Sequence, residues 1–357
     1  MSMRAESATR QLSIAFQTDK ALTAYGALAA AVENYGFDAV TVYNDMLYQP
    51  AWLPLLEMAR ATQRITLGVA AVNPFTCHPI NIAGNIALID EASHGRAYLG
   101  LARGSWLGFV GLHPQRSVTA LREALRAVRH LLRRDPAPLP GEIFPLAGGD
   151  ALRWPILRPD IPFLLGAWGE QTIRACLDEI TAIKIGGSAN PDVIPHFRRI
   201  LDFDAATYGV QRMRRETEDA AATQRKVEIV IGAVSVVDED GAAARRLARR
   251  EVALYLPVVA ELDPTTSIEP ELLGRLKEAA ARYDFAAAAA LISDDLLDRF
   301  AIAGAPDAVA AHAEALFAAG ATRVEFGTPH GLTPERGLQL LGKQVRPGCV
   351  GRAGRQN

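Results

Sequence analysis

Two polar residues lie just after short apolar runs, where a protein of alternating strands and helices would bind a ligand. Asp45 follows the run Ala39–Tyr43, and His330 lies in the segment Thr-Pro-His-Gly after the run Arg323–Phe326. Because the carboxyl ends of parallel strands meet at one edge, a carboxylate and an imidazole there can form polar contacts with a bound molecule. Each also has a purely structural interpretation. Asp45 can be a turn or N-cap residue before a helix that begins near Trp52, and His330 can be an ordinary turn residue.

Two glycine-containing segments are typical of loops that bind an anion. The first, GAWGEQT, covers Gly166–Thr172, and the second, GGSANPD, covers Gly186–Asp192. Each joins a predicted strand to a predicted helix, where free backbone N–H groups and the helix dipole favour a phosphate. Because short loops also use glycine for steric reasons alone, a plain turn is the alternative interpretation.

Aromatic side chains at the same strand ends favour a flat aromatic ligand. Trp106 and Trp168 follow two of the predicted strands, and Tyr43 and Phe75 end or follow two others. Large apolar side chains with a few polar groups typically wall a small-molecule pocket. Each of the four can equally be a packing residue, so only their shared placement favours binding.

These residues depend on a repeated pattern of strands and helices. Apolar runs predict eight strands, at Leu12–Phe16, Ala39–Tyr43, Ile65–Val72, Ala97–Leu101, Pro162–Gly166, Ala182–Ile185, Val227–Val234 and Arg323–Phe326. Helices are predicted at Leu22–Asn34, Trp52–Ala61, Pro79–Ala92, Val118–Leu132, Glu170–Glu179, Asp192–Ala206, Glu239–Leu254 and Pro306–Ala319. Strands that alternate with helices pair in parallel, and eight of them favour an α/β fold closed into a (β/α)₈ barrel. A doubly wound open sheet is the alternative.

Two segments do not fit this pattern. Residues 133–160, rich in proline and glycine, are expected to form an irregular excursion or a hairpin. Residues 257–300 are expected to form a helical insertion between the seventh and eighth strands. Because the sequence shows no internal repeat and no convincing linker, we expect one domain over residues 1–357 with these two insertions.

Composition and missing motifs argue against several classes of protein. A net charge of −2 provides no electrostatic footprint for nucleic acid, and no apolar run approaches the roughly 20 residues of a membrane span. Cys77, Cys176 and Cys349 lack metal-ligand or redox spacing, and we expect no metal. Sparse cysteines and the absence of an apolar amino-terminal segment predict a cytoplasmic protein. Hydrolase and nicotinamide-binding Rossmann motifs are missing.

The segment NPFTCHPINIAGNIALIDEASHGRAYLGLARG, residues 73–104, resembles the bacterial luciferase-like superfamily. Within it, the match is best to the deazaflavin-dependent branch typified by methylenetetrahydromethanopterin reductase. The blocks YGFDAVTVYND, GVAAVNPFT, DEASHGRAYLGLARG, GAWGEQT and VEFGTPHG resemble blocks of that family, in the same order. The likeness runs from about residue 12 to about residue 340.

The resemblance implies a (β/α)₈ barrel that binds coenzyme F420, an 8-hydroxy-5-deazaflavin, at the carboxyl ends of its strands. Because C5 of a deazaflavin accepts or donates a hydride, it implies an oxidoreductase acting on a small organic substrate such as an imine, an alkene or a ketone. It also implies a homodimer, and a non-proline cis peptide between Ala70 and Ala71 against the deazaflavin ring. The residues that it assigns to the cofactor are Asp45, Ala70, Ala71, Asn73, Gly104, Ser105, Ala167, Trp168, Gly169, Gly186 and Gly187.

The sequence departs from that family at two positions that handle protons. Met46 follows Asp45 where many deazaflavin-dependent relatives have histidine, and Gln17 stands where the reductase carries glutamate. Neither methionine nor glutamine can titrate. Another group must therefore exchange the proton if the substrate needs one, and the candidates for this catalytic role are Asp45, His330 and Tyr43.

Two other functions stay open on the sequence alone. One is an FMN-dependent monooxygenase of the same superfamily, which must protect a flavin peroxide. The other is a non-catalytic flavin-binding barrel, which Gln17 and Met46 suggest. Titration with F420 and with FMN separates the first alternative from an F420-dependent enzyme, and turnover of a reduced cofactor excludes the second.

Overall fold

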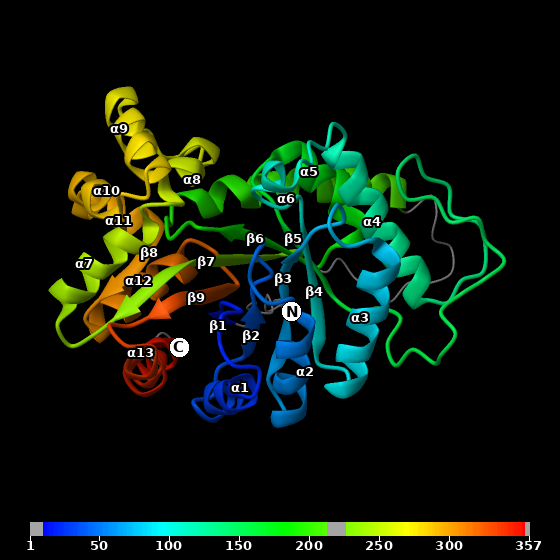
Figure 1. The fold of residues 1–357 in the computed structure, drawn as a ribbon, viewed down its shortest axis with the longest axis horizontal. Coiled ribbons are helices and arrows are strands. Elements are labelled where there is room, and N and C mark those ends of the chain that lie inside the picture. Colours follow the sequence, from blue (N-terminus) through cyan, green and yellow to red (C-terminus); the bar gives the residue numbers. More distant parts are fainter. Residues whose placement is uncertain (1–9, 213–225, 354–357) are drawn as a thin grey trace, which may run out of the picture. The chain divides into compact units, whose positions relative to one another are not determined.

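The computed structural model describes residues 10–212 and 226–353 (Figure 1). Its internal contacts divide the chain into two compact units. The amino-terminal unit comprises Ile14–Gly186 and His196–Val227. The carboxy-terminal unit comprises Met1–Ser13, Gly187–Pro195 and Glu228–Asn357.

The amino-terminal unit is built on parallel strands that are neighbours in the chain and in the sheet. From β2 to β6, each strand pairs in parallel with the next, and the Tyr43 N–H donates to the Phe16 carbonyl at 2.9 Å beside β1. Consecutive apolar residues form these strands because both faces of a parallel sheet are covered. The strands are β1 (Gln11–Phe16, which begins in the other unit), β2 (Ala39–Val42), β3 (Thr66–Val72), β4 (Ala97–Ala102), β5 (Phe163–Gly166) and β6 (Ala182–Gly186). The helices are α1 (Ala24–Asn34), α2 (Trp52–Ala61), α3 (Pro79–Ala92), η1 (Leu107–Val110), α4 (Ser117–Leu132), α5 (Glu170–Cys176), η2 (Leu177–Glu179) and α6 (Val193–Arg212, which begins in the other unit).

The carboxy-terminal unit is organised around one long strand. β7 (Glu228–Val237) pairs in parallel with β9 (Arg323–His330) and, over its last four residues, with β8 (Ala301–Gly304). Figure 1 shows the helices from α8 to α11 gathered near α7, in yellow to orange. The helices are α7 (Gly241–Val252), α8 (Leu256–Leu262), α9 (Pro270–Ala281), α10 (Phe285–Leu291), α11 (Asp294–Phe300), α12 (Pro306–Ala318), α13 (Pro334–Leu340), η3 (Leu341–Val345) and α14 (Arg346–Ala353).

The sequence predicted eight strands, and each of them is present, but it missed β8. Ala301–Gly304 follows α11 without a turn, and three of its four residues are alanine or glycine, so its sequence does not look like a strand. It becomes one because β7 continues past its predicted end at Val234, and Val234–Val237 pair with it. The helical segment before it, predicted over residues 257–300, contains α8 to α11.

Residues 133–160 form an irregular excursion that one carboxylate holds in place. A single antiparallel bridge joins Leu139 to Leu146. The carboxylate of Glu123, on α4, accepts the backbone N–H groups of residues 142, 143 and 144 at 2.8–3.0 Å. Burial opposes the charged form of Glu123, but the three N–H donors outweigh it and hold its pKa below the usual value.

Candidate functional site

Small residues lie at the carboxyl ends of β3 to β6. Ala71, Ala102, Gly166 and Gly186 are each partly exposed there, and we call these four residues the small-residue floor. A Cβ built on Gly166 would lie 3.2 Å from the Cβ of Ala102 and 4.0 Å from that of Ala71. A Cβ built on Gly186 would meet no atom within 4 Å, so open space lies in front of this residue. A flat molecule can therefore approach the backbone here.

The peptide bond between Ala70 and Ala71 is cis, which confirms the bond predicted from the resemblance. The pairing of β3 with β4 shifts register between Val69 and Val72 around it. On β4, a Cβ at Gly100 would lie 2.4 Å from the Val69 carbonyl oxygen and 3.0 Å from the Cα of Ala70. Only glycine fits so close to another backbone, so Gly100 is the residue that allows β3 and β4 to pack at this bulge.

Trp168 follows β5, and its side chain reaches Gly186 at the end of β6. Its indole Nε1–H donates to the Gly186 carbonyl at 3.2 Å, and its ring meets Phe197 edge to face at a centroid distance of 5.8 Å. These two contacts fix the plane of the indole. Trp106, by contrast, has a left-handed backbone and leaves 51% of its surface exposed on the segment after β4.

The loops after β1 and β2 are joined by a hydrogen bond between two predicted site residues. The amide Nε2 of Gln17 donates to Oδ2 of Asp45 at 2.8 Å, and both side chains reach solvent. Asp45 does not cap α2, since no side chain accepts from the first turn of that helix. The Asn44 oxygen instead accepts the N–H of Ala51, at 3.1 Å. The hydrogen bond to Gln17 places the carboxylate of Asp45 beside the loop that follows β1.

Lys184 is a residue of this region that the sequence reasoning missed. It lies on β6 with 8% of its surface exposed, and its ammonium Nζ is 5.0 Å from the centroid of the Tyr43 ring. That distance is within the range of a cation–π interaction. The available signal was a single lysine inside the apolar strand Ala-Ile-Lys-Ile-Gly, because a lysine at such a position is rarely fully buried without a partner.

Asn73 and Gly104 shape the wall beside β3 and β4. The Asn73 side-chain oxygen accepts the N–H groups of Phe75 and Thr76 at 3.0 and 2.9 Å, and so closes the turn after β3. Gly104 has a φ of +87°, and a Cβ there would lie 3.1 Å from the Asn73 side chain. The backbone conformation and this contact both require glycine. Ser105 follows it and is exposed.

The loop after β6 uses its backbone donors within the protein. In the carboxy-terminal unit, the N–H of Gly187 donates to the Gly232 carbonyl at 2.7 Å and that of Ala189 to the Arg299 carbonyl at 2.8 Å. The N–H of Asn190 donates to the Ser188 hydroxyl at 3.2 Å. The predicted anion loop therefore offers few free N–H groups at these positions.

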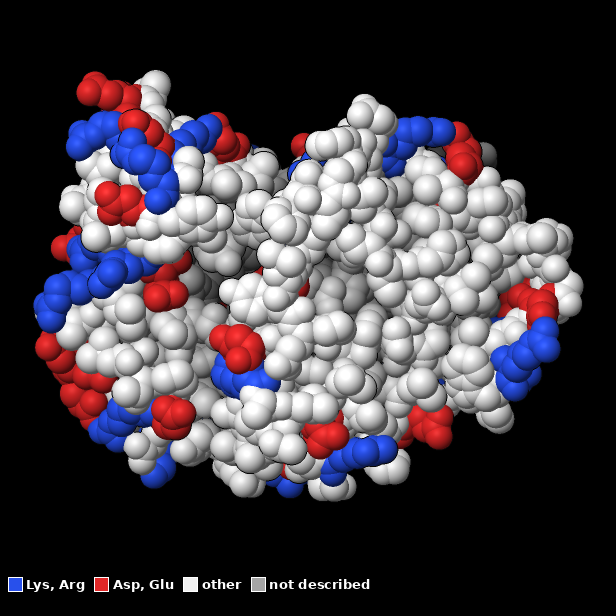
Figure 2. Space-filling model, viewed as in Figure 1, with Lys and Arg blue, Asp and Glu red and all other residues white. Residues whose placement is uncertain are grey.

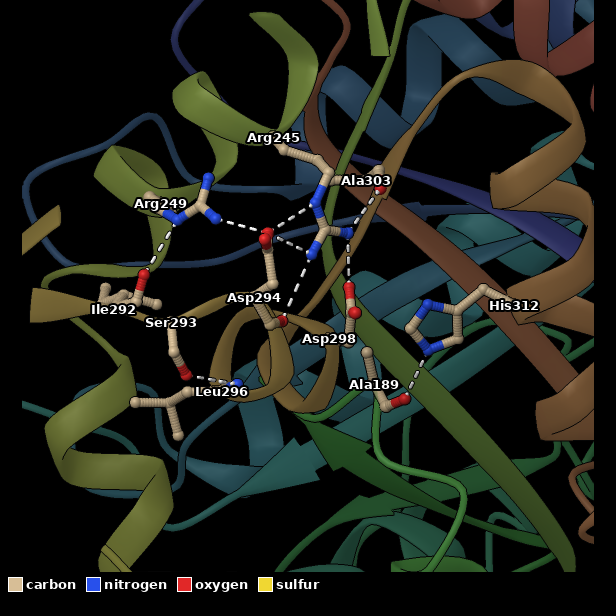
Figure 3. A network of polar contacts seen from close by, with 10 residues as sticks. All are labelled: Ala189, Arg245, Arg249, Ile292, Ser293, Asp294, Leu296, Asp298, Ala303 and His312. Atoms are coloured by element: carbon tan, nitrogen blue, oxygen red, sulfur yellow. Dashed lines mark hydrogen bonds and ion pairs between the residues drawn. The ribbon is translucent and has the colours of Figure 1, made fainter. Parts of the chain in front are cut away.

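The helical insertion and α12 both contact the same loop, and the Asn190 side-chain amide donates to the Thr265 hydroxyl at 2.9 Å. Figure 3 shows the His312 ring directed at the Ala189 carbonyl, and Nε2 lies 2.7 Å from that oxygen. Burial lowers the pKa of His312, and Nε2 donates this hydrogen bond because a carbonyl oxygen only accepts. In the same view, Arg245 and Arg249 of α7 converge on Asp294 at the start of α11.

His330 is a less accessible candidate than the sequence suggested. It ends β9 in the carboxy-terminal unit, with φ +78° and 1% of its surface exposed. A Cβ on Gly337 would lie 2.3 Å from its carbonyl carbon, so the backbone of α13 packs tightly against it. This burial does not support the predicted role of His330 in proton transfer. Asp45, by contrast, is exposed, and Tyr43 is partly exposed.

Charged side chains of both signs are distributed over the visible face of the protein (Figure 2). On the face in Figure 2, acidic and basic side chains are interspersed, and much of the visible surface carries neither. Within residues 10–212 and 226–353, no group of three or more His, Cys, Asp and Glu side chains could hold a metal ion. None of the helices described there combines the length and hydrophobicity needed to cross a lipid bilayer.

Relatives of known sequence match nearly the whole chain. The 5,10-methylenetetrahydromethanopterin reductase of Methanopyrus kandleri is 28% identical over 343 residues, which are 90% of this chain and 93% of the relative. The enzyme of the same name from Methanolobus tindarius is 25% identical over 321 residues, 89% of this chain and 94% of the relative.

Solved structures match it over the same extent. The coenzyme F420-dependent tetrahydromethanopterin reductase from Methanopyrus kandleri superposes with a TM-score of 0.81 at 26% identity, covering 95% of this chain and 99% of that one. An F420-dependent secondary alcohol dehydrogenase, in complex with an F420–acetone adduct, shares the fold with a TM-score of 0.71 at 17% identity, covering 96% and 99%. The fold is the predicted (β/α)₈ barrel, and the alternative of an open doubly wound sheet is excluded.

A family model described as luciferase-like monooxygenase matches residues 4–323. Because this match spans most of the sequence and the fold is shared with the reductase, the chain belongs to the luciferase-like monooxygenase family.

Proposed function

We propose that the protein is a coenzyme F420-dependent oxidoreductase that transfers a hydride between the deazaflavin and a small organic substrate, such as an imine, an alkene or a ketone. The observation that carries this proposal is the small-residue floor beside the cis peptide of Ala70 and Ala71. Support comes from relatives over nine-tenths of the chain, which are named as reductases, and from two solved neighbours named as F420-dependent.

The residues at the floor fit a tricyclic ring. Ala71, Ala102, Gly166 and Gly186 place no bulky group above the strand ends, and the space in front of Gly186 is open. The fixed indole of Trp168 can pack against an aromatic edge or face. Other residues that we assign to the cofactor are Asp45, Ala70, Asn73, Gly104, Ser105, Ala167, Gly169 and Gly187.

The bound deazaflavin supplies the hydride chemistry at its C5 atom, and the protein supplies binding, orientation and a proton. The floor and Trp168 orient the ring and exclude water from one of its faces. Productive transfer needs the substrate carbon about 3–3.5 Å from the reacting atom, so the exposed side of the site must hold the substrate closely. Asp45, held by the amide of Gln17, can accept or release the substrate proton at its free oxygen. Tyr43 can do the same at its hydroxyl.

Titration of the purified apoprotein with F420 and, separately, with FMN tests the choice of cofactor. We expect saturable binding of F420 and weak binding of FMN. Tight binding of FMN without affinity for F420 would replace this proposal with the flavin-dependent monooxygenase. Reduced F420 is then offered a panel of cyclic imines, enones and ketones. Binding of F420 without oxidation of the reduced form by any of them would favour a non-catalytic barrel.

We further propose that the protein is a cytoplasmic homodimer that does not bind nucleic acid. Light scattering at micromolar concentration measures the mass in solution. The mass of one chain, 38.4 kDa, would contradict the dimer.

A further inference from the structure

Gln17 is held in one orientation by contacts at both ends of its side-chain amide. Its Oε1 accepts the backbone N–H of Thr18 at 2.9 Å, and its Nε2 donates to Oδ2 of Asp45 at 2.8 Å. A backbone N–H only donates and a carboxylate only accepts, so exchanging the two ends of the amide would set donor against donor and acceptor against acceptor. Thr18 is fully buried, and without this acceptor its N–H group would be left unsatisfied. The amide of Gln17 therefore always presents its donor end to Asp45.

The backbone beside this amide is also held in place. The Gln17 carbonyl accepts the ammonium of Lys20 at 3.3 Å. The Thr18 carbonyl accepts the N–H of Gln49, from the loop after β2, at 3.0 Å. The loops after β1 and β2 are thus joined by a backbone contact as well as by the side chains, so the donor stays beside Asp45.

Asp45 has a second carboxylate oxygen that the protein does not use. In the part of the chain that the structure describes, no hydrogen bond reaches Oδ1, and the residue is exposed. The charged groups nearest to this pair along the two loops are Asp19 and Lys20, which pair with each other at 2.5 Å. Across the sheet, the ammonium of Lys184 lies 5.0 Å from the centre of the Tyr43 ring. Oδ1 is therefore the position at which a ligand can meet the carboxylate.

We infer that Gln17 is a positioning residue that holds Asp45 as a proton acceptor, and that the substrates are secondary alcohols and amines, with the ketones and imines formed from them. This inference rests on the proposed function. A donor fixed at Oδ2 stabilises the ionised carboxylate, whose Oδ1 can accept a hydrogen bond from an O–H or N–H group of the substrate. The product of alkene reduction offers only C–H bonds at the reacting carbons, and these are weak hydrogen-bond donors.

The proton and the hydride leave such an alcohol in different directions. The O–H bond breaks and its proton passes to Oδ1 of Asp45, while the electron pair of that bond becomes the second bond between oxygen and carbon. The C–H bond of the same carbon breaks with its electron pair, and the hydride passes to oxidised F420, which is reduced as the alcohol is oxidised. Because Asp45 is exposed, it then releases the proton to water. An amine reacts in the same way at nitrogen and gives an imine.

The first test needs neither cofactor nor substrate. Gln17→Glu brings together two carboxylates, which then share one proton. The folded variant binds this proton more tightly than the unfolded chain, so its stability is greatest near pH 5 and falls as the proton is lost toward pH 8. We expect its urea midpoint to fall relative to the wild type over this range. Adding Asp45→Asn supplies an amide that can donate to the new carboxylate, and it should abolish the fall.

Gln115→Glu is the matched control for this measurement. Gln115 is exposed in the same unit, and its amide donates to the His113 carbonyl and not to a carboxylate. The variant has the same change of charge, but the group that it faces does not titrate. Its urea midpoint should therefore follow that of the wild type from pH 5 to pH 8.

The second test follows the reduction of oxidised F420 by the alcohols and amines that correspond to the ketones and imines of the panel. We expect turnover by the wild type at a rate that is constant from about pH 7 to about pH 9. In Gln17→Glu, the rate at pH 7 should fall about 10-fold, with little change in KM, and should recover toward pH 9, where the shared proton is lost. The double variant with Asp45→Asn should fold but stay inactive, because its carboxylate lies at position 17.

A urea midpoint of Gln17→Glu that follows the wild type at every pH would overturn the role of Gln17, and so would an unchanged pH profile of the rate. Failure of Gln17→Glu to fold supports the role if the double variant folds, and overturns it if the double variant fails as well. Turnover confined to enones would overturn the substrate class. If the wild-type protein does not bind F420, or binds it without turnover, the proposed function and the substrate class fail, whereas the urea midpoints still decide whether Gln17 controls the proton on Asp45.

Discussion

Substituting Gly186 with valine tests whether the small-residue floor holds the cofactor ring. A Cβ at this position meets no atom of the protein within 4 Å, and the residue does not need a positive φ. The folded protein therefore accommodates the new side chain without a clash. We expect the free energy of unfolding to stay within about 0.5 kcal/mol of the wild-type value, as for other substitutions away from packed sites.

The effect on binding follows from the same geometry. A ring in van der Waals contact with the strand ends lies about 3.5–4 Å from their atoms, so the two methyl groups of valine would occupy its volume. Forcing extra methyl groups into a packed contact typically costs about 1–3 kcal/mol. Since about 1.4 kcal/mol is a factor of ten in a dissociation constant, Gly186→Val should weaken F420 binding about 5- to 150-fold.

Fluorescence titration with F420 measures the dissociation constant, and chemical denaturation measures stability. Gly274→Val is the matched control, because a Cβ at Gly274 on α9 also meets nothing within 4 Å. It should bind F420 as the wild type does. Wild-type affinity in Gly186→Val would show that the ring does not lie over this floor, and the assignment of the site would be wrong.

Three further predictions concern proton transfer, stability and reactivity. Asp45→Asn should keep F420 affinity within about threefold and lower the turnover rate about 100-fold or more. Oxidation of reduced F420 with any accepted substrate measures this rate. An unchanged rate would show that Asp45 is not the group that transfers the proton. Glu123→Gln should destabilise the fold by about 1–3 kcal/mol in chemical denaturation, since its carboxylate accepts three backbone N–H groups. The folded pKa of Glu123 is lowered from 4.5, so the stability that its carboxylate contributes is present above about pH 4.5 and is lost as the pH falls through the folded pKa. The free energies of unfolding of wild type and variant should therefore converge at low pH. A difference that stays constant with pH would contradict the assignment. Burial raises the pKa of Cys176 to about 12, so iodoacetamide at pH 8 should leave this thiol unmodified in the native protein, and mass spectrometry of its peptide would reveal any error.

Several parts of the fold follow from local pattern alone. The strand predicted at Ile65–Val72 is observed at Thr66–Val72, and the helix predicted at Pro79–Ala92 has those bounds in the structure. A strand buried on both faces reads as a continuous apolar run, and a helix start carries its own signals. Pro79, for example, occupies the first turn of α3, and the side chain of His78 caps it.

Other features depend on partners that lie far away in the sequence. The short run Ala301–Gly304 becomes β8 because the end of β7 pairs with it. The N–H groups of the loop after β6 appeared available from the sequence, but carbonyls such as those of Gly232 and Arg299 already accept two of them. His330 looked like a residue of an open loop, and the packing of α13 buries it.

The sequence by itself determined the alternation of strands and helices and the placement of Asp45 after a strand, because each depends on residue types at short spacing. The family and the cis bond between Ala70 and Ala71 followed from the resemblance of several sequence blocks to known proteins. Tertiary structure alone decided that Ala102, Gly166 and Lys184 lie side by side and that the lysine reaches Tyr43. The physical reason is that side-chain contacts depend on how far apart residues lie in space. Such distances are set by the register of strands that are separated by tens of residues.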